Sequence, residues 1–375
     1  MIYMDNAATT KMRPEVVRAM LPYMGERYGN PSGLYSLSKD VSRDVRKARE
    51  QIAATIGASP EEIFFTSGGT ESDNWALKMS VSGRKGHIVT SAIEHSAILK
   101  SCDYLEQQGN RVTRVLPDEF GIVGSRSIER AIRQDTRLVS VMMANNEIGT
   151  IEPVEDIGAV ARRNGVLFHT DAVQAYTNIP IDVQTMNIDM LSVSGHKLNG
   201  PKGIGFLYIR NRCLDKAFIN GGGQEMGLRS GTENVAGIMG LAKAAQIAND
   251  NMMTRTAYEI AIRDYMIGRV LNEIDYVKLN GHKSYRLPNN INFSFAYADG
   301  ATLVLMLDKQ GICASSGSAC SSSSRKASHV LTAIGVSDEL AHGTVRFTIN
   351  ENITRREIDY TVECLKQNVA KLRNA

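Results

Sequence analysis

The sequence contains few cysteines, and none of them forms a C-x-x-C pair. The five are Cys102, Cys213, Cys313, Cys320 and Cys364. Without close pairs, local spacing indicates neither a zinc site nor an iron–sulfur site, and we expect no bound metal. An odd and sparse set is also not typical of a disulfide framework. Cysteine usage therefore favours a reducing compartment, the cytoplasm.

Long apolar runs and strong charge are missing as well. No uninterrupted apolar segment approaches the roughly 20 residues that a membrane helix needs, and residues 1–5 do not resemble a signal peptide. The formal net charge is only +3, and no basic run marks a nucleic-acid arm. With 43% hydrophobic and 22% charged residues, the composition is that of an ordinary soluble enzyme. We expect no membrane partner and no direct nucleic-acid binding.

The hydrophobic patterns predict an α/β fold with a mostly parallel sheet and helices on both faces. Strands are predicted at 62–66, 87–91, 111–116, 137–144, 166–169, 189–193 and 205–210. Helices are predicted between them, at 14–24, 38–56, 70–78, 97–108 and 154–164. A long helical stretch over 235–273 then leads into a second pattern, with strands at 290–295 and 344–348 and helices at 301–310 and 355–372. At 375 residues the chain is long enough for two domains, with a predicted boundary near residue 255.

Lys197 follows an apolar strand in the segment Ser194-Gly195-His196-Lys197. Open α/β sheets bind ligands at the carboxyl ends of their strands. Partial burial there would lower the pKa of the lysine and free its amine for Schiff-base chemistry. Most lysines are simply solvated, so this segment alone does not identify a site.

Asp171 and Gln174 follow another apolar strand and reach the same sheet edge. A carboxylate there could pair with a protonated pyridine nitrogen, and Gln174 could bind the ring's phenolic oxygen. Asp171 could also cap the next helix.

The segment Thr66-Ser67-Gly68-Gly69-Thr70-Glu71-Ser72 joins a strand to a helix through glycines. Exposed N–H groups and the helix dipole favour an anion at such a junction. The alternative is a capping box between Thr70 and Asp73. Neither a Walker loop nor a G-x-G-x-x-G motif is present.

Three single residues carry weaker signals. His95 follows a strand and could stack on a flat ring, although a lone histidine is more often structural. Arg346 lies in an alternating strand, where it could pair with a surface acid or clamp a substrate carboxylate. Cys320 lies among small residues in 314–324, as expected for an exposed, reactive thiol, whereas a serine-rich linker would have no need of it.

Together these residues resemble the NifS/IscS-type cysteine desulfurases, which are fold-type I pyridoxal-phosphate (PLP) enzymes related to class-V aminotransferases. The resemblance runs nearly end to end, through 3–10, 29–32, 66–74, 145–149, 169–174, 194–205, 229–234, 315–320 and 328–331. It implies a seven-stranded large domain at 15–255. A smaller α+β domain would comprise 1–14 and 256–375 and would carry the Cys320 loop.

The resemblance also implies how PLP is held. The residues expected around its ring are Lys197, Asp171, Gln174 and His95, of which Lys197 and His95 are expected to be catalytic. The residues expected at its phosphate are Gly69, Thr70, Ser194 and His196, joined by Thr232 of the neighbouring subunit. A homodimer with shared sites follows.

The implied reaction removes sulfur from L-cysteine, giving L-alanine and a persulfide on Cys320. Asn146 and Arg346 would bind the substrate, Arg346 at its carboxylate. The persulfide would pass to an acceptor protein for iron–sulfur cluster assembly or for tRNA or cofactor thiolation. Three features depart from the family pattern: Tyr35, Met226 and the stretch after Cys320. They concern the acceptor surface and leave the PLP core intact.

Two other functions fit some of the same residues. A related PLP lyase acting on selenocysteine or cysteine sulfinate would depend less on Cys320. A non-catalytic sulfur-transfer platform would not need Lys197. A dehydrogenase is disfavoured, because the Gly200–Gly203–Gly205 spacing precedes a strand rather than a helix.

Overall fold

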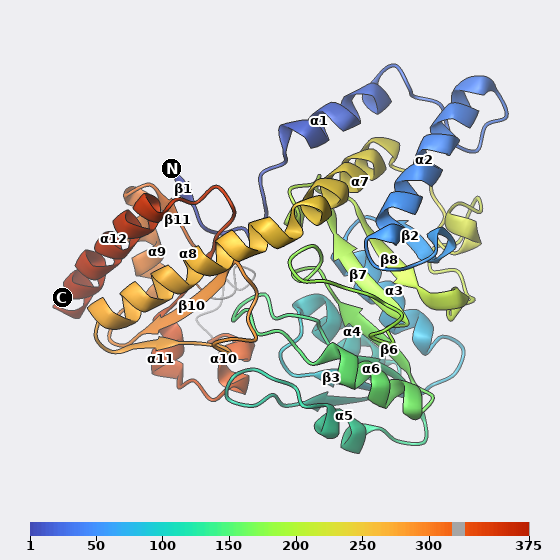
Figure 1. Cartoon of the computed structure of the whole chain (residues 1–375). Helices are drawn as coiled ribbons and strands as arrows, with labels where there is room; N and C mark the ends of the chain where they lie inside the picture. Colours follow the sequence, from blue (N-terminus) through green and yellow to red (C-terminus); the bar gives the residue numbers. More distant parts are fainter. Residues whose placement is uncertain (317–326, 375) are drawn as a thin grey trace.

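A seven-stranded sheet forms the core of one part of the molecule, on the right in Figure 1, in a computed structural model that describes residues 1–316 and 327–374. Its strands are β2 (Ile63–Thr66), β3 (His87–Ser91), β4 (Arg111–Val115), β5 (Thr136–Ser140), β6 (Leu167–Asp171), β7 (Met190–Ser194) and β8 (Gly205–Ile209). The spatial order is β2-β8-β7-β6-β5-β3-β4. Strand β8 runs opposite to the other six strands, so the predicted, mostly parallel sheet is confirmed.

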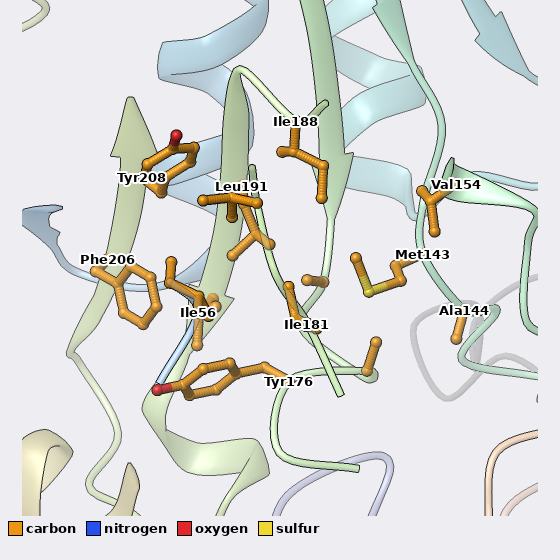
Figure 2. Packing of buried hydrophobic residues seen from close by; sticks show 14 of the residues in the cluster. Ile56, Met143, Ala144, Val154, Tyr176, Ile181, Ile188, Leu191, Phe206 and Tyr208 are labelled. Carbon is orange, nitrogen blue, oxygen red and sulfur yellow. The ribbon is translucent and has the colours of Figure 1, made fainter. Parts of the chain in front are cut away.

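Helices cover both faces of this sheet, because successive residues of each strand point to opposite sides. Phe64 and Leu207 pack with helices α3 (Gly69–Ser80) and α4 (Ser96–Gln107). Their neighbours Phe65 and Phe206 belong to the cluster on the other face, part of which Figure 2 shows. The helices on that second face are α1 (Pro14–Met20), α2 (Ser36–Ala54), α5 (Ser125–Ala131), α6 (Val154–Arg163) and α7 (Val235–Asp250).

The last third of the chain forms a separate hydrophobic cluster around a three-stranded antiparallel sheet. Its strands are β9 (Val277–Leu279), β10 (Asn290–Phe295) and β12 (Thr344–Thr348). The helices that contribute to it are α8 (Met252–Glu273), α9 (Gly300–Lys309) and α12 (Arg355–Arg373). The short helices α10 (His329–Ala333) and α11 (Asp338–His342) bury their apolar residues in the cluster of the large sheet instead. The division into domains at residue 255 stays a prediction.

The N-terminal segment runs from this second cluster to the large sheet. Strand β1 (Ile2–Tyr3) pairs with β11 (Ile312–Cys313), and Met4 is fully buried among the residues of the second cluster. Residues 7–10 then contact the end of β7: the Thr10 N–H donates to the carbonyl of His196 at 3.0 Å.

The predicted continuous helical stretch over 235–273 is interrupted. Helix α7 ends at Asp250 and α8 begins at Met252, because Asn251 between them folds its side-chain amide back onto the carbonyl of Ile247 at 2.9 Å. Among the residues described, no helix has both the length and the apolar character needed to cross a membrane.

Candidate active site

A cavity of about 480 Å³ lies where the carboxyl ends of several parallel strands meet the N-terminal segment and β12. Parallel strands place such ends on one edge of a sheet, which makes that edge the expected ligand site. The predicted residues that line the cavity are Gly69, Thr70, His95, Asn146, Asp171, Gln174, Ser194, His196, Lys197 and Arg346. Residues predicted from separate motifs are therefore brought together.

Two predicted residues are not placed there. Thr232 is exposed and does not line this cavity within the described chain, so its contribution to a neighbouring subunit stays a prediction. Cys320 lies outside the described residues.

Lys197 lies in a short 3-10 turn directly after β7. Its Nζ donates to the carbonyl of Ala8 at 2.8 Å and to that of Ala7. Gln174 also donates to the Ala7 carbonyl, at 3.1 Å. The N-terminal segment therefore holds the amine at the edge of the sheet, beside Gln174.

Asp171 is the last residue of β6 and is only 6% exposed. Burial raises the pKa of its carboxyl, while His95 and Lys197 act in the opposite direction. Its carboxylate accepts a hydrogen bond from the Val173 N–H at 2.9 Å, directly after the strand ends. Asp171 also lines the cavity.

Two further buried acids, Asp73 and Glu94, lie beside Asp171. Burial raises the pKa of both, that of Glu94 to about 8, and the charge of Asp171 adds to the effect. One oxygen of each acid has no hydrogen-bond partner among the described residues. Behind them, burial lowers the pKa of His169 to about 3. The sheet therefore presents concentrated acidic groups to the cavity, a suitable environment for a cationic ring nitrogen.

The first turn of α3 forms an anion-binding position in the same cavity. Gly68 precedes the helix with φ +147, a conformation that favours glycine, and the helix begins at Gly69. Burial and nearby Lys197 lower the pKa of His196 to about 4, so its ring is neutral, and its Nδ1 lies 3.1 Å from the Thr9 hydroxyl. Backbone N–H groups, two hydroxyls (Thr70 and Ser194) and a neutral imidazole suit a phosphate group.

We call the residues Gly69, Asp73, Asp171, Ser194 and Lys197 the sheet end of the cavity. Their chemistry fits PLP: an amine for the aldehyde carbon, a carboxyl for the ring nitrogen and a helix N-terminus for the phosphate.

We use the name arginine end for four other residues that line the cavity and for the one acid that pairs with the arginine: Asn146, Glu147, His329 and Arg346, and Asp5. Arg346 in β12 is 3% exposed; it donates to the carboxylate of Asp5 at 2.8 Å and to the backbone carbonyl of Asn146 at 3.0 Å. Its Nε has no partner among the described residues. A buried guanidinium with a spare donor facing a cavity suits a carboxylate ligand.

The sequence interpretation missed several site residues. Asp73 was considered only as a capping partner of Thr70, but α3 begins at Gly69 with Gly68 as its N-cap. The available signal was that Asp73 lies one turn after Gly69. Glu94 adjoins His95, whereas Asp5, Glu147 and His329 lie inside segments that carry the resemblance but had no role assigned to them.

The comparisons with known proteins agree with this geometry. The aminotransferase class-V family model matches residues 2–361. The chain is 49% identical to cysteine desulfurase IscS of Methanosarcina thermophila, covering 100% of this chain and 93% of that protein. It is 47% identical to the corresponding protein of Dictyoglomus turgidum, covering 99% and 95%.

Solved structures give the same result. A NifS-like protein superposes with a TM-score of 0.92 at 36% identity, covering 99% of both chains. A structure described as SspA in complex with cysteine superposes with a TM-score of 0.84 at 38% identity, covering 93% of this chain and 99% of the other.

Proposed function

This chain belongs to the aminotransferase class-V family and is a PLP-dependent cysteine desulfurase, and we propose that Lys197 carries the cofactor and that Cys320 receives the sulfur of L-cysteine as a persulfide. One observation carries these roles. An amine, a buried carboxyl and a buried guanidinium, those of Lys197, Asp171 and Arg346, line a single cavity.

The sheet end prepares the cofactor side of the reaction. When bound, PLP supplies an electron sink that stabilises negative charge on the substrate's carbon atoms. Asp171 keeps the ring nitrogen protonated, Gln174 binds the phenolic oxygen, and His95 stacks on the ring. Gly69, Thr70, Ser194 and His196 hold the phosphate. The Lys197 amine would hold the cofactor and, once free, would move the α-proton of the substrate.

The arginine end orients L-cysteine. Arg346 binds its carboxylate, with Asn146 beside it. Because Asp5 and the Asn146 carbonyl already fix the guanidinium, little side-chain entropy is lost on binding. The substrate is thereby held in a fixed orientation, with its side chain left free to react.

Cys320 is the proposed acceptor of that sulfur. Ser315 exchanges two backbone hydrogen bonds with Arg346, at 2.7 and 3.1 Å. Five residues span at most about 18 Å, so Cys320 is within chain reach of the cavity. The persulfide then passes to an acceptor protein for iron–sulfur cluster assembly or for tRNA or cofactor thiolation.

We also propose a homodimer in which Thr232 reaches the phosphate of the neighbouring site. The exposure of Thr232 leaves it available for that contact. A cytoplasmic location fits thiol chemistry, and the four described cysteines are all free thiols.

The test is to incubate the PLP-loaded protein with L-cysteine and measure both alanine and protein-bound persulfide. We expect Cys320→Ser to abolish both, and the control Cys213→Ser, at a half-buried position outside the cavity, to retain both. Full alanine formation by Cys320→Ser would contradict the persulfide role and favour a lyase. No alanine from the unmodified enzyme would contradict the function as a whole.

A further inference from the structure

His329 lines the same cavity, although none of the roles above uses it. It is the first residue of α10 and is exposed within the single chain, so a ligand in the cavity can reach its ring. Its Nε2 lies 3.0 Å from the backbone carbonyl of Glu94. A second imidazole therefore faces the site, next to His95.

The hydrogen bonds assign different proton positions to the two imidazoles. The Glu94 carbonyl can only accept, so His329 carries its proton on Nε2 and leaves Nδ1 free as an acceptor. The Ala97 N–H can only donate, and it donates to His95 Nδ1 at 3.2 Å, so neutral His95 carries its proton on Nε2. Counting hydrogen bonds between the described residues, only the ring of His329 has a nitrogen that can take a proton without breaking an existing bond.

His329 is also linked to the arginine end by short contacts. The hydroxyl of Ser328 donates to the buried carboxylate of Glu147 at 2.6 Å. Glu147 directly follows Asn146, whose carbonyl accepts from Arg346. A substrate carboxylate bound at Arg346 would therefore bring the attached amino group to the side where His329 lies.

The other charged or titratable groups that line the cavity with His329 are Asp73, Glu94, His95, Glu147, Asp171, His196, Lys197 and Arg346. Four of these eight are acids, and the charge of Arg346 is already paired with that of Asp5. A proton passed to His329 therefore enters a cavity that is rich in acidic side chains.

We propose that His329 is a catalytic base for the substrate's amino group, an inference that rests on the proposed roles of Lys197 and Arg346. L-Cysteine arrives with an ammonium group, which is not nucleophilic. His329 Nδ1 takes one proton: an N–H bond of the substrate breaks, its electron pair stays on the substrate nitrogen, and a new N–H bond forms on the imidazole. The proton returns to the amino group of L-alanine as the product leaves, so the cycle balances without oxidation or reduction.

The test uses PLP-loaded enzyme mixed with L-alanine, which has no sulfur to transfer. The rate of the cofactor's absorbance change is followed by stopped flow from pH 6.5 to 9.5. We expect His329→Gln, whose amide can still donate to the Glu94 carbonyl, to slow this step about a hundredfold at pH 7. The loss should shrink towards pH 9.5, where the amino group of free alanine loses its proton unaided. The control His342→Ala, at an exposed position of α11 outside the cavity, should match the unmodified enzyme.

Three outcomes would overturn the proposal. One is a His329→Gln variant that has the rate and pH profile of the unmodified enzyme. Even if His329→Ala were slow, that result would assign His329 only a structural contact with the Glu94 carbonyl. Another is a loss that stays constant across the pH range. The third is a pH-rescued loss in His95→Gln instead. Because the alanine reaction does not involve Cys320, this result is separate from the persulfide test.

Discussion

The two ends of the cavity are built in different ways. The sheet end comes from the last residues of the adjacent strands β6 and β7, from the turn after β7, and from helix α3, which follows strand β2 of the same sheet. The arginine end is assembled from segments far apart in the sequence: Asp5 and Arg346 are 341 positions apart. The sheet end therefore depends on local chain order, whereas the arginine end depends on how the two sheets come together. The comparison implies that cofactor binding and substrate binding can be damaged separately.

Removing the amine of the sheet end should have the largest effect. We expect Lys197→Ala to lose alanine formation by about 10⁴-fold or more and to lose the visible absorbance of the lysine-bound cofactor. The control is Lys202→Ala, an exposed lysine on the same loop. An unchanged absorbance spectrum in Lys197→Ala would contradict the proposal that Lys197 carries the cofactor.

Removing the guanidinium should damage substrate binding alone. We expect Arg346→Ala to lower kcat/KM for L-cysteine by about 10²–10³-fold, mainly through KM, because a buried charge pair loses one partner. The cofactor absorbance should stay normal. Loss of bound cofactor in this variant would contradict the expectation, because it would show that cofactor binding and substrate binding cannot be damaged separately.

A smaller effect is expected from the acid that holds Arg346. Asp5→Asn replaces a charged acceptor by a neutral one, and KM should rise about tenfold. The matched control is Asp40→Asn, which breaks an exposed pair with Arg43 and should change nothing measurable. Equal kinetics for both variants would show that the Asp5 contact does not orient the arginine.

The smallest effect concerns stability and the buried acid Glu94, which lies beside the sheet end. The pKa of Glu94 is raised to about 8 by burial, so the folded protein keeps this proton above pH 4.5 while the unfolded chain releases it. The contribution of Glu94 to stability therefore falls as pH rises from 4.5 to 8. We expect this fall to be smaller in Glu94→Gln. The Tm of the variant minus that of the unmodified protein should therefore be a few °C larger at pH 7.5 than at pH 5. Glu119→Gln, in an exposed turn, is the control, and parallel Tm curves for all three proteins would contradict the expectation.

The sequence predicted the sheet end well for a physical reason. Apolar strands are visible as short runs, and polar residues that follow them in a parallel sheet must share one edge. Asp171, Ser194 and Lys197 were found in this way, and the cavity brings them together. Element boundaries were less accurate: the strand predicted at 137–144 ends at Ser140.

The arginine end could not be predicted in the same way. An arginine in an alternating strand carries no information about which acid it will meet, so the Asp5 contact of Arg346 becomes visible only in three dimensions. The hydrogen bond from His329 to the Glu94 carbonyl joins residues 235 positions apart. The resemblance supplied the role of Arg346 but gave none to His329.

The path of residues 4–10 has a consequence for how the protein is made. These residues are translated long before their partners: the backbone amide of Ala7 donates to the hydroxyl of Thr348, and Asp5 pairs with Arg346. During translation the large sheet can fold while residues 4–10 still lack their partners on β12. We therefore expect a ribosome-stalled chain that ends before residue 344 to leave the pocket incomplete.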